Sequence, residues 1–276
     1  STLLNQLVKS KVAIVSDKPQ TTRHAIRGVV TLPDAQIVLV DTPGLHKPRT
    51  LLGERLNSVV RTTLEEVDAI VFMLDASVTI GKGDTYIANE LAGLQTPVVC
   101  VINKADKVLP PQLLAQMEVA RRLGQYKELL TTSAKNGTGI TDVLTTVTGF
   151  LPEGPMLYPA ETITDQPENL VIAEIIREKA LDLTREEVPH SVAVVIDEMQ
   201  KRPDADLIDV FAIAYVERES QKGILIGRGG KMLKEIGTRA RKEIEALLGS
   251  KIYLDLRVKV EPHWQRNAEL VKRLGY

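Results

Sequence analysis

Val98-Val99-Cys100-Val101-Ile102-Asn103-Lys104-Ala105-Asp106 is the stretch of sequence that decides the fold of the first part of the chain. Its apolar residues predict a buried strand, and the polar tetrapeptide Asn103–Asp106 follows directly. The carboxyl ends of parallel strands are where α/β sheets bind their ligands. A carboxylate at position 106 can accept two N–H groups from the Watson–Crick edge of guanine, a donor pair that adenine lacks. Taken alone, the tetrapeptide is equally consistent with a polar turn.

Apolar strand patterns continue on both sides of this stretch. Pro33-Asp34 predicts a hairpin turn between the first two of them. Helical patterns separate most of the others, which favours a mostly parallel sheet with helices on both faces. The other expected strands are Ile26–Leu32, Ile37–Asp41, Ala69–Asp75 and Leu129–Ser133.

The composition changes after Phe150. The segment Leu151–Pro167 is rich in proline, has no clear periodicity and is typical of a linker. After it we expect a second, α+β domain with the order α-β-β-α-β. Its expected elements are helix Glu168–Thr184, strands Val192–Ile196 and Ile208–Val216, helix Gly230–Leu248 and strand Ile252–Val260. The predicted organisation is a first domain over 1–152, a linker over 153–166 and a second domain over 167–276.

Composition limits the class of protein. The 276 residues have a net charge of −1 and are 43% hydrophobic, which is enough to form a packed core. The single cysteine, Cys100, is predicted to be a buried structural thiol, and the spacing of the four histidines does not suggest a zinc site. No stretch is long and apolar enough to predict a membrane span, and no signal peptide is evident, so a cytoplasmic protein is expected.

Three further motifs accompany Asn103–Asp106. Asp41-Thr42-Pro43-Gly44 ends a predicted strand, where a carboxylate can hold magnesium and a glycine N–H can approach a phosphate. Ser133-Ala134-Lys135 also follows a strand, and its backbone N–H groups can meet the guanine carbonyl. Gln20-Thr21-Thr22-Arg23 offers a threonine hydroxyl that can bind magnesium when the γ-phosphate is present. Each motif alone is also consistent with an ordinary turn.

Together, in this order, the four motifs resemble those of Ras-like GTPases. The resemblance implies an α/β P-loop GTPase domain that uses GTP or GDP and Mg²⁺. It assigns magnesium contacts to Ser1, Thr22 and Asp41, and catalytic positions to Thr21, Thr22, Gly44 and Leu45. Leu45 stands where Ras-like proteins commonly have a water-orienting glutamine, so slow intrinsic hydrolysis is expected. The implied nucleotide contacts are Ser1, Thr2, Asp41, Thr42, Pro43, Gly44, Asn103, Lys104, Asp106, Ser133, Ala134 and Lys135.

The start of the sequence resembles a phosphate-binding loop from its last residue onward. That motif ends in a lysine followed by a serine or threonine, and Ser1 would supply the hydroxyl of this last position. The glycines, the lysine and the preceding strand are not in the sequence. We therefore expect a longer natural protein, and weak GTP binding by residues 1–276 alone.

Gly227-Arg228-Gly229-Gly230 is the main motif of the second part. It has the G-x-x-G form of a KH domain, in which bare backbone lies against RNA phosphates. Between residues 221 and 260 there are ten basic and four acidic residues, although the whole chain is nearly neutral. A solvated helix face would also be charged. The residues expected to bind RNA are Ile226, Gly227, Arg228, Gly229, Gly230, Lys231 and Lys234.

A Ras-like domain followed by a G-x-x-G domain resembles the Era-type GTPases, and the similarity extends from Ser1 to Tyr276. The resemblance implies a type II KH domain and a role in assembling the small ribosomal subunit. The KH domain would bind the single-stranded 3′ end of small-subunit ribosomal RNA. The resemblance also implies a monomer in the cytoplasm, which in some members of the family associates peripherally with the inner membrane.

Two alternatives remain at this stage. The chain could be a nucleotide-regulated RNA-binding module with little or no turnover, which Leu45 favours. It could also be another GTPase of the superfamily, such as one acting in tRNA modification. The G-x-x-G segment counts against the second alternative. Trp264, after the last strand, could stack on an RNA base, but packing in a C-terminal helix is favoured.

Overall fold

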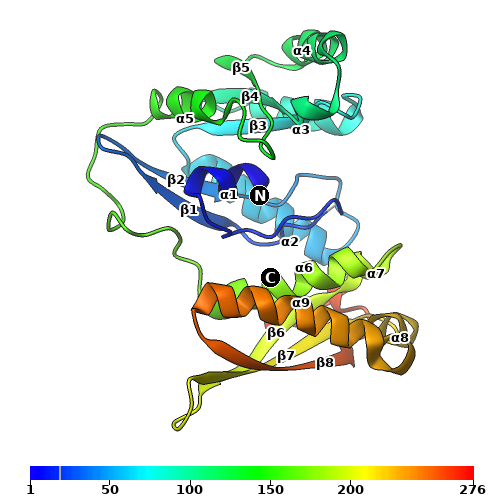
Figure 1. The fold of residues 1–276 in the computed structure, drawn as a ribbon. Coiled ribbons are helices and arrows are strands. Elements are labelled where there is room, and N and C mark those ends of the chain that lie inside the picture. The colour runs from blue at the N-terminus through cyan, green and yellow to red at the C-terminus, as the bar shows by residue number, and fades with distance from the viewer. Residues whose placement is uncertain (19) are drawn as a thin grey trace. The chain divides into compact units, whose positions relative to one another are not determined.

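The computed structural model describes residues 1–18 and 20–276. Contacts divide the chain into two compact units (Figure 1). The first contains Ser1–Val12, Ala25–His46 and Val59–Thr164, and the second contains Ala13–His24, Lys47–Ser58 and Asp165–Tyr276. Two short N-terminal segments thus pack with the C-terminal residues. Local sequence patterns carry no information on such long-range packing.

The first unit contains a parallel sheet and an antiparallel ribbon. Strands β3 (Ile70–Asp75), β4 (Val98–Asn103) and β5 (Glu128–Thr131) are parallel in the order β3-β4-β5. β1 (Ile26–Thr31) and β2 (Gln36–Asp41) form an antiparallel pair, as the predicted turn at Pro33-Asp34 requires. The helices are α1 (Thr2–Val8), α3 (Lys82–Ala92), α4 (Pro110–Leu123), α5 (Ile140–Thr148) and the 3-10 turn η1 (Ala105–Lys107), and helix α2 (Leu51–Glu66) contributes residues to both units.

β4 is buried on both faces, which explains its uninterrupted apolar sequence. Cys100 and Ile102 face a core with α3 and α4. Val99 and Val101 face a second core, formed with α1, α5 and β2. The α/β expectation is therefore confirmed. Cys100 is fully buried as predicted, and its burial raises the pKa of its thiol to about 12.

The predicted linker makes specific contacts in the first unit. The Val29 N–H donates to the Ile163 carbonyl at 2.8 Å, and the Thr164 hydroxyl donates to the Arg27 carbonyl. The Gln36 amide exchanges hydrogen bonds with the backbone of Leu157 and Tyr158. These bonds tie the segment to the β1–β2 ribbon, a pairing that its proline-rich sequence does not reveal.

The second unit is a three-stranded sheet with helices across one face (Figure 1). β6 (Ala193–Lys201) pairs antiparallel with β7 (Leu207–Val216), which pairs parallel with β8 (Lys251–Val260). Helices α6 (Glu168–Leu183) and α9 (Lys231–Leu248) bury Ile176 and Ile244 against it. The remaining elements are α7 (Val188–Ser191), α8 (Glu219–Ile226), η2 (Arg228–Gly230), η3 (Trp264–Arg266) and α10 (Ala268–Arg273).

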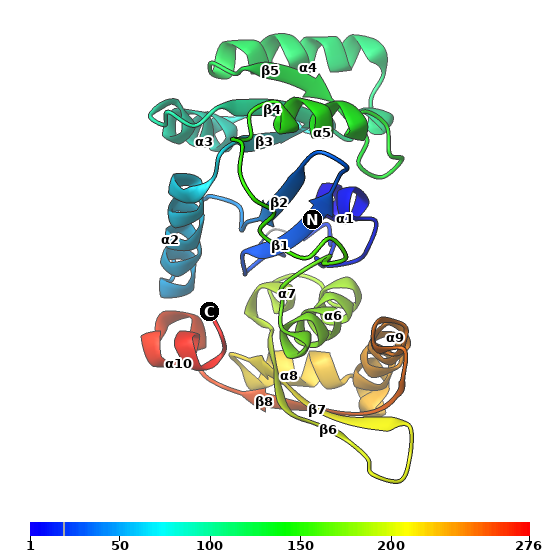
Figure 2. The same cartoon turned by 90° about the vertical axis from the view of Figure 1, so that its left-hand side faces the viewer.

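A smaller core lies around Trp264. The indole is fully buried, and its Nε1–H donates to the Ser191 carbonyl at 2.9 Å. Leu52 and Leu56 from the start of α2 and Val271 from α10 pack in the same cluster, and Figure 2 shows α10 beside that end of α2. The packing role predicted for Trp264 is thus confirmed.

The structure differs from the sequence-based elements mainly at α8. No helix was expected between strand Ile208–Val216 and helix Gly230–Leu248, but Glu219–Ile226 is helical, so the second unit has the order α-β-β-α-α-β. Gln221 explains the start of this helix, because its side chain accepts from the N–H groups of Glu217 and Arg218. β6 extends beyond the predicted Ile196 to Lys201, and Ser133 lies after β5 instead of within it. Among the described residues, no helix is long and apolar enough to cross a membrane.

Candidate functional site

Asn103, at the end of β4, connects two of the predicted nucleotide loops. Its Oδ1 accepts from the Thr132 hydroxyl at 3.1 Å and from the Ala134 N–H at 2.9 Å. The side chain is buried together with Ala134, so both acceptor bonds are shielded from water. The loop after β4 is further joined to the loop after β5 by a bond from the Ala105 N–H to the Thr132 carbonyl. The asparagine therefore fixes the relative positions of these two loops.

Asp106 is exposed and is oriented by the loop after β5. The Ser133 hydroxyl donates to Asp106 Oδ1 at 2.5 Å. This hydrogen bond lowers the pKa of Asp106, and the charges of Lys135 and Lys107 add to the effect. The carboxylate is therefore ionised at neutral pH and able to accept hydrogen bonds. An oriented, ionised acceptor is what recognition of the guanine N–H pair requires.

Lys104 is held by Asp75, a residue outside the four sequence motifs. Lys104 has a left-handed backbone (φ 62°), and its Nζ lies 2.5 Å from Asp75 Oδ2 at the end of β3. Asp75 Oδ1 accepts from both the N–H and the hydroxyl of Ser77. Partial burial raises the pKa of Asp75, but the bonds from Lys104 and Ser77 outweigh it and lower the pKa overall. The pairing register of β3 and β4 could have located Asp75, because Asp75 lies directly opposite Asn103 in the sheet.

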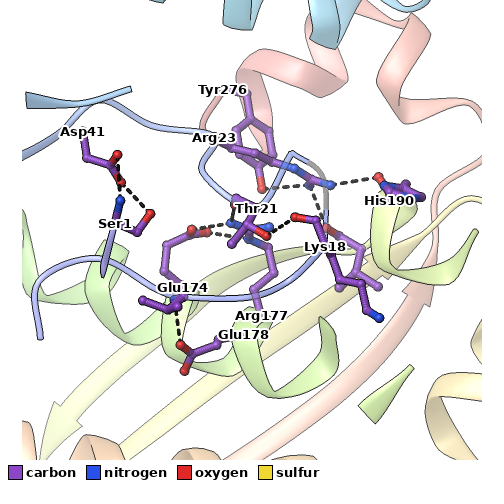
Figure 3. A network of polar contacts seen from close by, with 12 residues as sticks. Ser1, Lys18, Thr21, Arg23, Asp41, Glu174, Arg177, Glu178, His190 and Tyr276 are labelled. Atoms are coloured by element: carbon purple, nitrogen blue, oxygen red, sulfur yellow. Dashed lines mark hydrogen bonds and ion pairs between the residues drawn. The ribbon is translucent and has the colours of Figure 1, made fainter. Parts of the chain in front are cut away.

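Ser1 and Asp41 meet in the first unit, at the end of β2. The Ser1 hydroxyl donates to Asp41 Oδ2 at 2.7 Å (Figure 3). Thr2 begins α1, Thr42 and Leu45 are partly buried, Pro43 is buried and Gly44 is exposed. A Cβ on Gly44 would meet nothing within 4 Å, so its backbone is open to a close approach.

The described residues contain no group of three or more His, Cys, Asp or Glu side chains that could hold a metal ion. Magnesium prefers six oxygen ligands. Ser1 and Asp41 could supply two, and nucleotide phosphates and water would have to supply others. The donor set therefore fits a nucleotide-bound Mg²⁺ better than a metal bound by protein alone.

Thr21 and Thr22 belong to the second unit. Thr21 is nearly buried, its hydroxyl donates to the Lys18 carbonyl at 2.7 Å, and its own carbonyl accepts from Arg177 of α6 (Figure 3). Thr22 is partly buried. The roles of Thr22 in binding magnesium and of both threonines in catalysis remain predictions.

Two arginines of the second unit are buried at the threonine loop, Arg23 within the loop and Arg177 on α6. Arg23 and Arg177 are both almost fully buried, and each has one guanidinium nitrogen, Nε of Arg23 and Nη1 of Arg177, without a hydrogen-bond partner among the described residues. Leaving such a group unpaired costs about 1–3 kcal/mol. Burial lowers the pKa of Arg23, whereas Glu174 outweighs desolvation and raises that of Arg177. Both guanidinium groups remain charged. Arg23 belongs to the motif Gln20–Arg23, but its burial was not expected and no sequence motif included Arg177, because arginine is usually exposed.

The G-x-x-G turn connects α8 to α9. Gly227 (φ 72°), Gly229 (φ 60°) and Gly230 (φ 75°) all have left-handed backbones that other residues rarely adopt. A Cβ on Gly227 would lie 2.6 Å from Met232 Cβ, whereas Gly229 and Gly230 face open space. Gly227 therefore serves local packing, and the next glycines leave the backbone accessible.

The turn has a positive, accessible surface. Arg228, Gly229, Lys231 and Lys234 are exposed, while Ile226, Gly227 and Gly230 are partly buried. No ion pair involves Arg228, Lys231 or Lys234 among the described residues. Unpaired cations next to bare backbone are suited to contacts with RNA phosphates.

Comparisons with known proteins match both parts of the chain. A family model described as "KH domain" matches residues 187–265, and one described as "50S ribosome-binding GTPase" matches residues 1–104. The GTPase Era of Streptomyces coelicolor is 52% identical over 286 residues, which covers 100% of this chain and 90% of the relative. The GTPase Era of Mycolicibacterium smegmatis is also 52% identical, over 100% of this chain and 94% of the relative.

Two solved structures are similar along the whole chain. One is a crystal structure of Era in complex with MgGDPNP and nucleotides 1506-1542 of 16S ribosomal RNA, with 42% identity and a TM-score of 0.96. The other is a point variant of Aquifex aeolicus Era bound to GDP.AlF4-, with 41% identity and the same TM-score. Each covers 100% of this chain, and 94% of the solved chain is matched. The chain therefore belongs to the Era family of GTPases, with a Ras-like GTPase domain and a C-terminal KH domain.

Proposed function

We propose that this protein binds GTP or GDP with Mg²⁺, hydrolyses GTP, and binds the 3′ end of small-subunit ribosomal RNA through the Gly227–Gly230 turn. The observation that carries the nucleotide part is the ionised Asp106 carboxylate, oriented by Ser133 beside the loop that Asn103 fixes. The full-length similarity to Era with bound MgGDPNP and 16S ribosomal RNA supports both ligands.

The chain's own residues supply recognition at two places. Asp106 would accept the guanine N–H pair, Lys104 would cover the base, and the backbone after Ser133 would meet the guanine carbonyl. Ser1, Thr22 and Asp41 would provide oxygen ligands for Mg²⁺, which stabilises charge on the phosphates when bound. Leu45 has no group that can orient water, so another group of the protein or a partner must help to position it.

The RNA part of the proposal depends on backbone and charge. Gly229 and Gly230 leave the backbone open, and Arg228, Lys231 and Lys234 add positive potential at the start of α9. Partly buried Ile226 offers an apolar surface next to the turn for a base. We further propose that this RNA binding serves assembly of the small ribosomal subunit by a cytoplasmic monomer that can associate peripherally with the inner membrane.

Hydrolysis assays on the natural protein test the enzyme. GTP turnover that requires Mg²⁺, with ATP left intact, is the expected result. Tight GTP binding without turnover, either alone or with RNA, would favour the RNA-binding module with an inactive GTPase domain. Cofractionation with small ribosomal subunits, and its loss after Gly229→Asp, would test the role in assembly.

A further inference from the structure

The loop that carries Thr21 and Thr22 is held by the same unit that carries the RNA-binding turn. Residues 13–24 cluster with Asp165–Tyr276. The Val15 N–H donates to Glu178 Oε1 of α6 at 2.9 Å, and Arg177, also on α6, donates to the Thr21 carbonyl. Main-chain groups before Thr22 are thus bonded to side chains of one helix of the KH fold.

Arg23 fixes the other side of the threonine pair. Its Nη1 donates to the Val192 carbonyl at 2.7 Å, and its Nη2 donates to the His190 carbonyl at 2.8 Å (Figure 3). The guanidinium carbon lies 5.7 Å from the ring centroid of Trp264 and 5.5 Å from that of Tyr276. Bonds to two carbonyls and contacts with two rings leave Arg23 little freedom to move.

Arg177 is equally constrained. It is fully buried on α6, and its Nε and Nη2 form a two-point contact with Glu174 at 2.7 and 2.5 Å. Glu174 neutralises the buried charge and sets the direction of the guanidinium. The remaining donation, to Thr21, therefore comes from a group whose orientation the RNA-binding unit determines.

A purely structural role is the simpler alternative, because buried charged pairs also occur in ordinary cores. Two features favour a positioning role. Arg177 bonds to the carbonyl of Thr21, the residue directly before the predicted magnesium ligand Thr22. Arg23, directly after Thr22, bonds to the carbonyls of His190 and Val192. Arg23 Nε and Arg177 Nη1 have no hydrogen-bond partner among the described residues. An arrangement selected for stability alone would pair both groups.

We infer that Arg23 and Arg177 are positioning residues for GTP turnover, which hold Thr21 and Thr22 on the KH unit in the conformation that hydrolysis uses. The inference rests on the proposed function, since it assigns a source of order to the loop that would bind Mg²⁺. It also assigns a use to the stack of buried Trp264 and partly buried Tyr276, whose ring centroids are 5.7 Å apart. The stack is the surface against which the loop is held.

Steady-state hydrolysis by Arg23→Met in the natural protein tests this directly. We expect kcat to fall roughly 10- to 100-fold, the effect of a misplaced catalytic group, while KM for GTP and affinity for RNA stay unchanged. Arg23→Lys should recover part of kcat, because lysine retains the charge but lacks the two-point geometry.

Arg202→Met is the matched control. Like Arg23, Arg202 lies over an aromatic ring of the same unit, 5.9 Å from the ring centroid of Tyr253, and it is hydrogen-bonded, to Asp209. Unlike Arg23, it is exposed and far from the threonine loop in sequence. The kcat of the Arg202→Met variant should equal that of the unmodified protein. Unchanged kcat in folded Arg23→Met, or parallel losses of kcat, RNA affinity and melting temperature, would overturn the inference. Absence of turnover in the unmodified protein would defeat the proposed function itself, and the inference with it.

A second readout requires no destabilising change. Trp264 is the only tryptophan in the sequence, so intrinsic fluorescence reports on the ring beneath Arg23. Because the loop is held against this ring in the structure, saturation with Mg²⁺ and GDPNP should leave the Trp264 emission of the unmodified protein and of Arg202→Met unchanged. A marked change in emission, in a protein shown to have bound GDPNP, would contradict a loop that stays held against this ring during turnover.

Discussion

The Ser133 hydroxyl donates a hydrogen bond of 2.5 Å to Asp106 Oδ1, so the residue predicted to select the base is oriented by the loop after the neighbouring strand. The same loop is fixed to β4 by the bond between Ala134 and Asn103. The two motifs thus form one structural unit. A substitution in either motif is therefore expected to alter recognition of the base.

Asp106→Asn should change base preference from guanine toward xanthine. The asparagine side chain presents an amide donor that complements the additional xanthine carbonyl, whereas it cannot accept both guanine N–H groups. We expect GTP affinity to fall by about 1–3 kcal/mol and XTP affinity to rise, with RNA affinity unchanged. Competition binding with GTP and XTP measures this. Asp34→Asn, in the exposed hairpin turn, is the control. Equal losses for both nucleotides and for RNA would indicate general unfolding.

Ser133→Ala should shift the acid limit of GTP binding to higher pH. The Ser133 bond lowers the pKa of Asp106, so the charged form persists until pH falls through that depressed pKa. Without the hydroxyl, the pKa rises toward its ordinary value and the carboxylate protonates earlier on acidification. GTP affinity measured from pH 7 downward should show the shift. An unchanged acid limit in a folded variant would rule out this role for Ser133.

Gly229→Asp should weaken RNA binding without affecting nucleotide binding, since a carboxylate would face phosphate. Gly229→Asn is the matched control, because it places a side chain of nearly the same size on the same left-handed backbone (φ 60°). The difference between the two variants isolates the charge. We expect the Gly229→Asp variant to bind RNA at least about tenfold more weakly than the Gly229→Asn variant. Titration of each variant with an RNA of the 3′-end sequence measures this. Equal affinities would contradict a phosphate contact at this turn.

Gly227→Ala should affect stability more than RNA contact. Its φ of 72° is unfavourable for alanine by about 1–2 kcal/mol, and the added Cβ would lie 2.6 Å from Met232 Cβ. Thermal unfolding should show a lower melting temperature, and Gly229→Ala, which has open space, should show the smaller loss. Similar losses in the two variants would mean that the Met232 contact is relieved by a small backbone shift.

Lys234→Gln should reduce the salt dependence of RNA binding. An exposed, unpaired cation that contacts a phosphate releases about one counterion, so the slope of log affinity against log salt should fall by about 0.7. Arg239→Gln on the same helix is the control, because Arg239 is paired with Glu235 at 2.7 Å. Its slope should change less. Identical slopes in the unmodified protein and Lys234→Gln would exclude a phosphate contact there.

Much of the fold followed from local patterns. The all-apolar β4 predicted a strand covered on both faces, and the alternation in Ile252–Val260 predicted β8 nearly to its ends. Helix α8 was missed because its three consecutive apolar residues, Ile224 to Ile226, resemble a buried strand more than an amphipathic helix. The capping bonds of Gln221 that start it become visible only in three dimensions.

The site was predictable where recognition depends on short motifs. Asn103, Asp106 and Ser133 meet because parallel strands end at one edge of the sheet. Asp75 and Arg177 lay outside such motifs. The bonds of Asp75 to Lys104, of Arg177 to Thr21 and of Arg23 to Val192 each join residues 29 or more positions apart, which local patterns do not reveal. A charged residue in an amphipathic sequence is expected to face water, and only tertiary packing shows that Arg177 does not.

Nucleotide-specific turnover by the natural protein tests the central claim most directly. With Mg²⁺ present, phosphate release should occur from GTP and not from ATP, and Asp106→Asn should transfer that activity toward XTP. Release of phosphate from ATP at a similar rate, or GTP turnover that Asp106→Asn leaves unchanged, would contradict a site in which this carboxylate selects guanine.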